Sequence, residues 1–577
     1  MNIRPLTKIT PAFAAEITGI DLRALDDATF AKVEDAFETY SVLVFPDQPL
    51  DDNAQIAFSK RFGELETTQG HIANNFTVKQ VSEITNLDPQ GNLMRAGDPR
   101  LVYRIGQRNW HSDSSFKIVP AKASLLHARR LPPNSEEGGQ TQFASLRAAF
   151  EPAGADEAGR IFNTYWFVAF AVATTLAYWL LRKPALRLSF LAIACVLFHY
   201  HFAGPAGMAP IIVLGILTYL IGLSRHRLAC VAGIVVAVLA LCFYKYAHFF
   251  VLDVLGLINP AWGQAIEKAA RASLPRIASP EGGTFLFIPP LGMSFFAFEF
   301  VHYLYEVRKG AAPLKNPLKF VLFSIFFPSL VAGPIKRFGQ FIPSLEAGAA
   351  GVNADDVAVG FRRIAMGFLK KVVIADNLTG YLELNLGTYD HPNLGNFAGA
   401  GLVLRWFYLV LVALRILFDF SGYSDIAIGL ARLLGIQLPE NFNWPYAARS
   451  IQDFWQRWHI SLSSWIRDYV YIPLGGNRHG AVRRIVNGLI AFALCGLWHG
   501  AAWNFVVWGL YHGIGLAVCA TYRNVPGVGR LLGWMFGKFP ALAWLVTEVF
   551  VCIGWLLFFY PLQSALLMAT QLFGYTR

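Results

Sequence analysis

Residues 490–513 read IAFALCGLWHGAAWNFVVWGLYHG, an apolar run with few polar side chains. With the apolar residues before it, the run is long enough to cross the roughly 30 Å hydrocarbon core of a bilayer. His499 lies inside it, between Trp498 and Gly500. Because an ionisable side chain at membrane depth is costly and usually functional, the stretch predicts a membrane helix with a candidate site at His499.

Runs of the same kind recur from residue 161 onward and predict a mainly α, polytopic membrane protein with about nine to twelve membrane helices. Segments 357–376 and 450–470 add amphipathic helices. The apolar runs lie near residues 165–181, 188–203, 208–223, 228–247, 284–304, 317–333, 398–418, 484–510 and 540–562.

The composition changes along the chain. Residues 1–150 carry 16 Lys and Arg and 18 Asp and Glu, whereas residues 151–577 carry 33 and 20 in a much longer segment. The whole chain is 55% hydrophobic and 15% charged, against about 25% charged in a typical soluble protein. A single soluble enzyme is therefore excluded. The excess positive charge is typical of cytoplasmic loops and does not indicate a nucleic-acid partner.

The first part is predicted to be a small mixed α/β domain. Its expected helices are 27–40 and 53–63, and its expected strands are 41–45, LVYRI (101–105), KIVP (117–120) and KASLLHA (122–128). The resulting domain organisation is an N-terminal fragment at 1–152, a linker at 153–160 and a membrane domain at 161–577.

Ionisable residues gather in three apolar stretches of the membrane part. One, at 418–435, carries two aspartates, and a second, at 450–480, carries His459 among tryptophans and arginines. The second is typical of a helix at the headgroup boundary or beside a polar cavity. The third is the run quoted first, which holds His499 and His512.

A neutral histidine can act as a general base at physiological pH. His499 can therefore take the proton of an acceptor hydroxyl as that hydroxyl attacks an acyl thioester, and the small residues 500–502 leave space for a substrate. The alternative for His499 is a structural histidine bonded to a neighbouring helix. His459 is either an interfacial anchor or a catalytic residue, and His512 is expected to be structural.

Six motifs in a fixed order make residues 161–562 similar to the membrane-bound O-acyltransferase (MBOAT) family. The resemblance is to the bacterial branch that contains the alginate O-acetylation and teichoic-acid D-alanylation membrane proteins. The motifs are RIFNTYWF (160–167), PPLGMSFFAFEFVHYLYEVRKG (289–310), FFPSLVAGPIKRF (326–338), DFSGYSDIAIGLARLLGIQLPENFNWPY (419–446), FWQRWHISLSSWIRDYVYIPLGGNR (454–478) and GLWHGAAWNFVVWGLYHG (496–513).

This resemblance implies catalytic roles for two histidines. His499, in the WHG motif, corresponds to the essential histidine of the family, and His459, in the RWHISLS motif, corresponds to the second one. Both are implied to line a tunnel through the protein. Residues with implied structural or tunnel-lining roles are Tyr423, Asp425, Asn441 and Arg457.

The resemblance also implies a reaction and its partners. The acyl group favoured by the resemblance is acetyl. It would pass from acyl-CoA or an acyl-carrier protein to a hydroxyl of a cell-surface polysaccharide or to a periplasmic acyltransferase partner. No cofactor is required for this transfer. The expected location is the bacterial inner (cytoplasmic) membrane. The chain is expected to cross its lipid bilayer several times.

The N-terminal fragment contains RNWHSDSSF (108–116), in which a His-x-Asp pair supplies two ligands of the facial triad of non-haem Fe(II) oxygenases. Together with SVLVFPDQPLDDNAQIAFSKRFGELE (41–66) and SLLHARRLPPNSEEGGQTQFASLRAAFE (124–151), it resembles the taurine dioxygenase family of 2-oxoglutarate-dependent oxygenases.

This second resemblance implies His111 and Asp113 as Fe(II) ligands and Thr141 as a 2-oxoglutarate contact, with Gln140 in place of the Asp of the GGDT motif. The family also needs a distal histidine and an arginine more than a hundred residues after the pair, where this chain has entered its membrane part. The fragment is therefore expected to be inactive. The alternative functions are a 2-oxoglutarate-dependent oxygenase with a membrane anchor and a transporter without chemistry.

Overall fold

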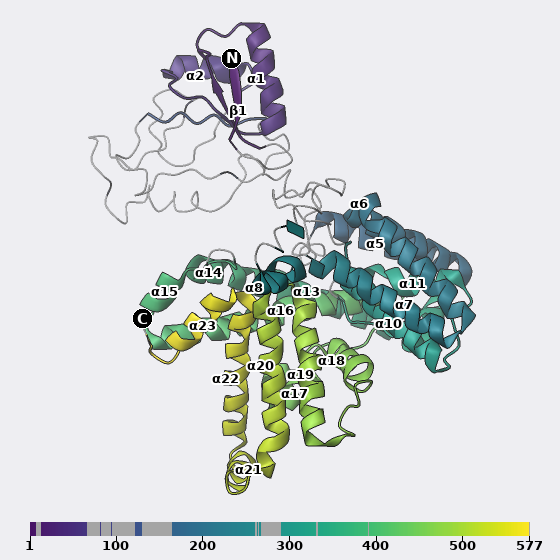
Figure 1. Cartoon of the computed structure of the whole chain (residues 1–577). Helices are drawn as coiled ribbons and strands as arrows, with labels where there is room; N and C mark the ends of the chain where they lie inside the picture. The colour runs from purple at the N-terminus through teal and green to yellow at the C-terminus, as the bar shows by residue number, and fades with distance from the viewer. Residues whose placement is uncertain are drawn as a thin grey trace. The chain divides into compact units, whose positions relative to one another are not determined.

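The computed structural model divides into two compact units, one formed mainly by residues 1–151 and the other by most of the remaining chain. Each unit is described by itself (Figure 1). The structure describes residues 1–6, 13–65, 81, 94, 122–129, 143, 164–247, 249–259, 262, 265–266, 290–330, 333–389 and 392–575.

The N-terminal unit pairs two helices with a three-stranded sheet. Strand β1 is antiparallel to β2, and β2 is parallel to β3. The helices bury a small core of Leu22, Phe30, Val33 and Phe58. The elements are β1 (Asn2–Pro5), β2 (Ala15–Thr18), α1 (Asp27–Tyr40), β3 (Leu43–Val44) and α2 (Asp52–Lys60).

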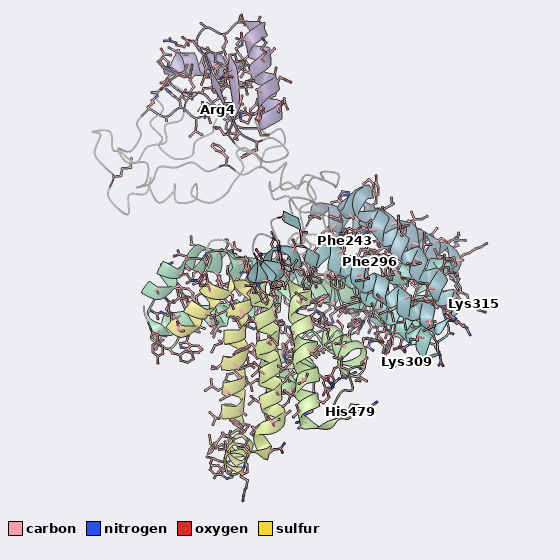
Figure 2. All side chains as sticks on the ribbon, viewed as in Figure 1. Arg4, Phe243, Phe296, Lys309, Lys315 and His479 are labelled. Carbon is pink, nitrogen blue, oxygen red and sulfur yellow. The ribbon has the colours of Figure 1, made fainter. Side chains whose placement is uncertain are left out.

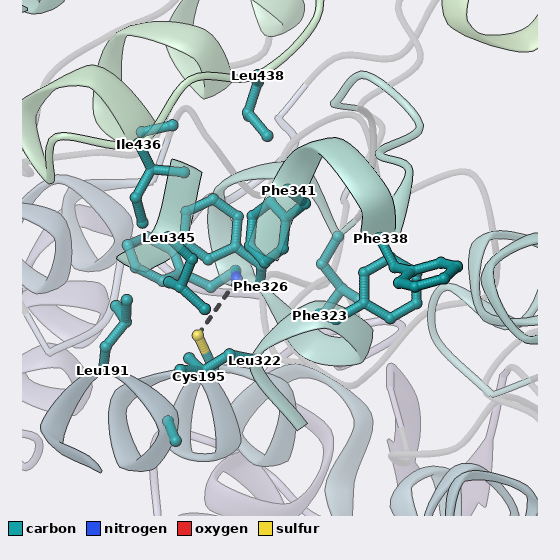
Figure 3. Close-up of a cluster of buried hydrophobic side chains, with 14 of the residues drawn as sticks. Leu191, Cys195, Leu322, Phe323, Phe326, Phe338, Phe341, Leu345, Ile436 and Leu438 are labelled. Carbon is teal, nitrogen blue, oxygen red and sulfur yellow. Dashed lines mark hydrogen bonds between the residues drawn. The ribbon is translucent and has the colours of Figure 1, made fainter. Parts of the chain in front are cut away.

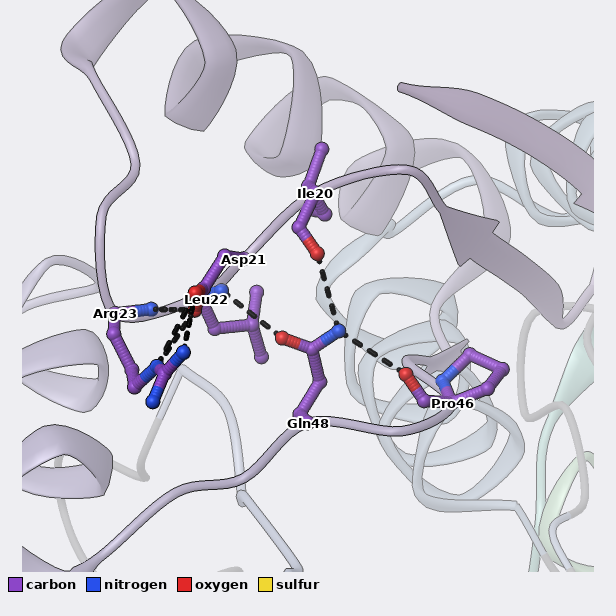
Figure 4. Close-up of polar contacts among 6 residues, drawn as sticks. All are labelled: Ile20, Asp21, Leu22, Arg23, Pro46 and Gln48. Atoms are coloured by element: carbon purple, nitrogen blue, oxygen red, sulfur yellow. Dashed lines mark hydrogen bonds and ion pairs between the residues drawn. The ribbon is translucent and has the colours of Figure 1, made fainter.

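The loops of this unit are tied together by the Gln48 side chain. Its oxygen accepts the main-chain N–H of Leu22 at 3.0 Å, and its amide donates to the carbonyl oxygen of Ile20 at 3.2 Å (Figure 4). Asp21 and Arg23 form an ion pair of 2.7 Å in the same loop. The segment after β2 is thereby held against the segment after β3.

Most of the predicted elements in the described part of this unit are confirmed. The helices expected at 27–40 and 53–63 correspond to α1 and α2, and the strand expected at 41–45 shortens to β3. KASLLHA (122–128) forms no strand, so that prediction is wrong. The strands expected at 101–105 and 117–120 lie outside the described residues.

The second unit is built from helices. Their bounds are α5 (Tyr165–Leu180), α6 (Pro184–Ser224), α7 (Arg227–Leu241), α8 (Leu255–Ile258), α10 (Met293–Lys309), α11 (Pro317–Ile325), α12 (Phe338–Ala350), α13 (Ala354–Phe368), α14 (Asp376–Leu386), α15 (Leu394–Gly399), α16 (Leu402–Leu433), α17 (Ile451–Arg457), α18 (Ile460–Ile466), α19 (Gly480–His499), α20 (Trp503–Thr521), α21 (Val528–Lys538), α22 (Pro540–Phe559) and α23 (Leu562–Gln571). Wider π-helical turns occupy Cys242–Tyr246, Phe249–Val254, Leu369–Ala375 and Arg467–Tyr471, and 3-10 turns occupy Phe327–Ser329, Pro445–Ala447 and Tyr522–Asn524.

Six helices of the described chain are long and apolar enough to cross a membrane, which is fewer than the nine to twelve expected. Some expected runs belong to shorter helices such as α10 and α11, and the run at 398–418 continues into the charged second half of α16. The six spans are Pro184–Pro205, Gly207–Ser224, Arg227–Tyr246, Gly480–His499, Trp503–Thr521 and Pro540–Phe559, and the shorter apolar helices are Trp166–Leu180, Phe249–Ile258 and Pro317–Ser329.

Aromatic side chains fill the core between α6, α11 and α12. Phe323, Phe326 and Phe341 pack there beside Cys195 of α6, whose sulfur accepts the Phe327 main-chain N–H at 3.4 Å (Figure 3). Trp and Phe residues likewise fill the second core around α16, α17, α20 and α22. This second core surrounds both candidate histidines.

Glycines allow two helix pairs to approach closely. A Cβ atom added at Gly367 of α13 would lie 2.7 Å from the Gly422 carbonyl oxygen of α16. A Cβ atom added at Gly496 of α19 would lie 2.1 Å from the Phe505 carbonyl oxygen of α20, and one at Gly509 would lie 2.1 Å from that of Phe492. In Figure 1, α19, α20 and α22 run side by side. The α19–α20 pair therefore depends on backbone contact.

Candidate functional site

His499 is the last residue of α19. The chain then turns through the extended residues Gly500 and Ala502 before α20 begins at Trp503. A Cβ atom at Gly500 would lie 2.1 Å from the Phe505 ring, so the turn needs glycine. The expectation of one continuous span at 484–510, with His499 inside it, is therefore wrong.

Aromatic rings surround His499. The centroid of its ring lies 4.7 Å from that of Trp498, 5.1 Å from that of Trp508 and 5.1 Å from that of Phe558. Within the part of the chain that the structure describes, neither ring nitrogen of His499 has a hydrogen-bond partner. The catalytic and the structural role of His499 both stay predictions.

His459 lies between α17 and α18, so the amphipathic helix expected at 450–470 is broken there. Its backbone is left-handed, with φ of 43°, and a non-glycine residue in this conformation costs roughly 1–3 kcal/mol. Its side chain is buried, with the ring centroid 4.6 Å from that of Phe420. The His459 side chain is thus enclosed by protein, and its role as an anchor or as a catalytic residue stays a prediction.

Trp498 brings the two histidines into one cluster. Its ring centroid lies 6.0 Å from that of His459, and it precedes His499 directly. The structure therefore assembles the two histidines that the sequence separates by forty positions.

Lys245 joins this cluster from the π-helical turn after α7. Its ammonium group donates a hydrogen bond to the carbonyl oxygen of Trp498. A cation at the C-terminus of α19 is favourable because the last carbonyl groups of a helix carry partial negative charge. Sequence reasoning missed Lys245, although it is the single lysine within the apolar run 228–247.

The aspartates of α16 hold that helix to α13 and the π-helical turn after it. Asp425 is buried and pairs with Arg363 at 2.5 Å and Lys370 at 2.6 Å. Asp419 pairs with Lys371 at 2.7 Å. Of the structural and tunnel-lining roles implied for Asp425, these contacts support the structural one.

His512 lies in the middle of α20. The side chain is fully buried, and its Nδ1 accepts the indole N–H of Trp455 at 3.4 Å. This contact joins α20 to α17. The contact supports the structural role expected of His512.

The candidate oxygenase residues His111, Asp113 and Thr141 lie outside the described residues. The structure therefore gives no test of the Fe(II) and 2-oxoglutarate site. Among the residues that are described, no three His, Cys, Asp or Glu side chains are grouped so that they could hold a metal ion.

Both histidines lie in the part of the chain that matches a known protein family. Residues 291–558 match the MBOAT, membrane-bound O-acyltransferase family. Residues 3–161 match the taurine catabolism dioxygenase TauD, TfdA family.

Individual relatives extend the similarity. A probable alginate O-acetylase of Azotobacter vinelandii is 37% identical over 56% of this chain and 58% of its own length. A peptidoglycan O-acetyltransferase of Helicobacter pylori is 32% identical over 72% of this chain and 80% of its own. A teichoic acid D-alanyltransferase of Bacillus subtilis is 33% identical over 46% of this chain and 68% of its own length. The chain thus spans somewhat more than half of the alginate relatives and most of the Helicobacter protein.

Proposed function

Because the chain belongs to the membrane-bound O-acyltransferase family, we propose that it is a multi-pass membrane enzyme that transfers an acyl group, acetyl in the first place, from a thioester to a hydroxyl. The observation that carries this proposal is the cluster of His459, Trp498 and His499 at the break between α19 and α20. All three residues lie inside the matched region.

In the proposed reaction, His499 takes the proton of the acceptor hydroxyl. The hydroxyl oxygen then forms a bond to the thioester carbonyl carbon, the carbon–sulfur bond breaks, and the leaving thiolate takes up the proton. General acid–base catalysis of this kind contributes roughly 10²- to 10⁴-fold. His459 positions the acceptor or stabilises the developing charge.

The surroundings of His499 support this role. Its ring is held between aromatic side chains of α19, α20 and α22, and no described residue occupies its nitrogen atoms. Lys245 fixes the carbonyl end of α19 next to it. A general base needs this combination of a fixed ring and a free lone pair.

The donor we propose is acyl-CoA or an acyl-carrier protein. The acceptor we propose is a hydroxyl of a cell-surface polysaccharide or a periplasmic acyltransferase partner, and the location is the bacterial inner membrane. The relatives named for alginate, peptidoglycan and teichoic acid support an acceptor in the cell envelope.

We do not propose oxygenase activity for the N-terminal fragment. His111 and Asp113 supply two of the three protein ligands of a facial triad, and the third would have to come from a position beyond residue 213, within the membrane unit. The match to the dioxygenase family ends at residue 161.

The experiment measures transfer of radiolabelled acetyl from acetyl-CoA or a charged carrier protein in membranes. It compares the intact chain, His499→Ala and a chain that starts at Arg160. The control is His479→Ala, because His479 is exposed at the opposite end of α19 (Figure 2), about 30 Å away for a twenty-residue helix.

We expect transfer to survive the truncation and the His479→Ala change and to be lost in His499→Ala. Equal transfer by His499→Ala and the intact chain would contradict the mechanism. The membrane unit would then be a transporter or an anchor. Turnover of 2-oxoglutarate that depends on His111 would instead favour the oxygenase.

A further inference from the structure

Asn441 accepts hydrogen bonds from the two residues that follow His459 in the chain. It is completely buried in the loop after α16. Its main-chain oxygen accepts the N–H of Ile460 at 2.9 Å, and its side-chain Oδ1 accepts the N–H of Ser461 at 3.3 Å. These two N–H groups are the first of α18, so Asn441 caps this helix. The left-handed residue His459 is thereby fixed at the start of α18.

The direction of each hydrogen bond around Asn441 follows from one main-chain group. The N–H of Ile335 donates to Ser461 Oγ at 3.0 Å. The main-chain N–H of Ser461 can only donate, so the Asn441 atom that it meets is the acceptor Oδ1. The hydroxyl of Ser461 therefore donates its hydrogen to the same oxygen at 2.9 Å. On the other side, Asn441 Nδ2 donates to Ser424 Oγ at 3.2 Å. The amide orientation of Asn441 is therefore set by its network.

This orientation determines where the proton of His459 lies. The Nδ1 atom of His459 is 3.0 Å from Asn441 Oδ1. Since that oxygen only accepts hydrogen bonds, Nδ1 must donate and carries the ring hydrogen. A neutral imidazole has one hydrogen, so Nε2 carries a lone pair. Within the described residues, this Nε2 is buried and has no hydrogen-bond partner.

The ring remains neutral in this environment. His459 lies outside the six candidate spans, and its burial lowers its pKa well below the usual value for histidine. No carboxylate contacts the ring among the described residues, and its polar neighbour is an uncharged amide. A neutral ring with hydrogen on Nδ1 has an acceptor at Nε2 and no donor there.

We propose that Asn441 is a positioning residue that holds His459 as the Nδ1-protonated tautomer, so that Nε2 accepts a hydrogen bond from an O–H or N–H group of a substrate. This inference rests on the proposed acyl transfer. It selects between the two roles open to His459, since an Nε2 lone pair cannot donate to a developing oxyanion. His459 then orients a substrate, and His499 remains the base.

Two substrates carry groups of this chemistry. One is the hydroxyl-bearing acceptor, and the other is the acyl donor, whose pantetheine arm has amide N–H groups in both coenzyme A and carrier proteins. The two sources differ in the Michaelis constant that a weakened His459 would change. Kinetics in which each substrate is varied in turn therefore distinguish them.

The first measurement is nitrogen NMR of the full chain in lipid nanodiscs, labelled with ¹⁵N at histidine and assigned with His459→Gln. We expect Nδ1 of His459 to give a protonated resonance and Nε2 an unprotonated one. A protonated Nε2 in the intact chain would overturn the inference. This spectrum does not depend on turnover, so absence of acyl transfer would count against the proposed function alone.

The second measurement uses variants of Asn441. Asn441→Ala is expected to mix the tautomers of His459 and to raise the Michaelis constant of one substrate about tenfold, as the loss of one hydrogen bond predicts. Asn441→Asp keeps an acceptor for Nδ1 and is expected to restore the tautomer. The matched control is Asn396→Ala, at an exposed position of α15.

Unchanged Michaelis constants in a folded Asn441→Ala chain with mixed tautomers would also overturn the inference. If Asn441→Ala does not fold, Ser461→Ala replaces it, because this change removes one donor to Asn441 and leaves the main-chain cap in place. The tautomer of the intact chain decides the question in either case.

Discussion

The contact between α19 and α20 sets the position of His499, and a single methyl group tests it. In Gly496→Ala the new Cβ atom would lie 2.1 Å from the Phe505 carbonyl oxygen. A carbon–oxygen contact of this kind normally measures about 3.3–3.6 Å. The two helices must therefore separate by roughly 1 Å, directly before the turn that carries the histidine.

Two effects follow from this separation. Overpacking a well-packed core costs about 1–3 kcal/mol of unfolding free energy, and a misplacement of about 1 Å near reacting groups can lower a rate about a hundredfold. We expect Gly496→Ala to lower both the unfolding temperature in detergent and the rate of acetyl transfer. Gly509→Ala, which meets the Phe492 carbonyl oxygen, is expected to do the same.

The matched control is Gly488→Ala on the same helix, where an added Cβ atom meets nothing within 4 Å. Alanine favours a helix over glycine by about 1 kcal/mol, so this variant is expected to be at least as stable as the intact chain and equally active. The reasoning is refuted if Gly496→Ala unfolds and reacts like Gly488→Ala.

Three further changes test the remaining contacts. Glu299→Gln leaves the buried Lys336 without its charged partner and is expected to lower the free energy of unfolding by about 3–5 kcal/mol. Glu299→Leu combined with Lys336→Met is expected to leave it nearly unchanged. Thermal unfolding would contradict this if the single change destabilised the protein less than the double change. Asp425→Asn removes the charge that pairs with two cations and is expected to speed hydrogen exchange in residues 369–375; unchanged exchange would show that these pairs do not hold the segment. Lys245→Met removes the cation from the C-terminus of α19 and is expected to lower acetyl transfer about tenfold, with Lys245→Arg retaining more activity than Lys245→Met; equal rates in these two variants would exclude a role for the charge.

The helices themselves were predictable from sequence because apolar periodicity depends on local residue order. The run at 228–247 corresponds to α7 and its π-helical turn, and the run at 540–562 corresponds to α22. The two breaks that build the site were not predictable in this way. Gly500 packs against the Phe505 ring, and the left-handed His459 precedes a helix that Asn441 caps. Neither contact follows from apolar periodicity.

The candidate site was predictable in part. His499 and His459 stood out as ionisable residues in apolar surroundings, and the structure brings both of them to Trp498. The contribution of Lys245 depends on a contact across more than two hundred and fifty residues, which no local pattern contains. Asn441 was recognised as a motif position, but its effect on His459 requires the hydrogen-bond directions that only the fold supplies.

Acyl transfer that depends on His499 is the central claim, and the most direct measurement follows both products in one reaction. Membranes with the intact chain or His499→Gln are given labelled acetyl thioester, and free thiol and acetylated acceptor are measured over time. We predict equal amounts of the two products from the intact chain and a rate at least about a hundredfold lower for His499→Gln. Equal rates for the two chains would contradict the account.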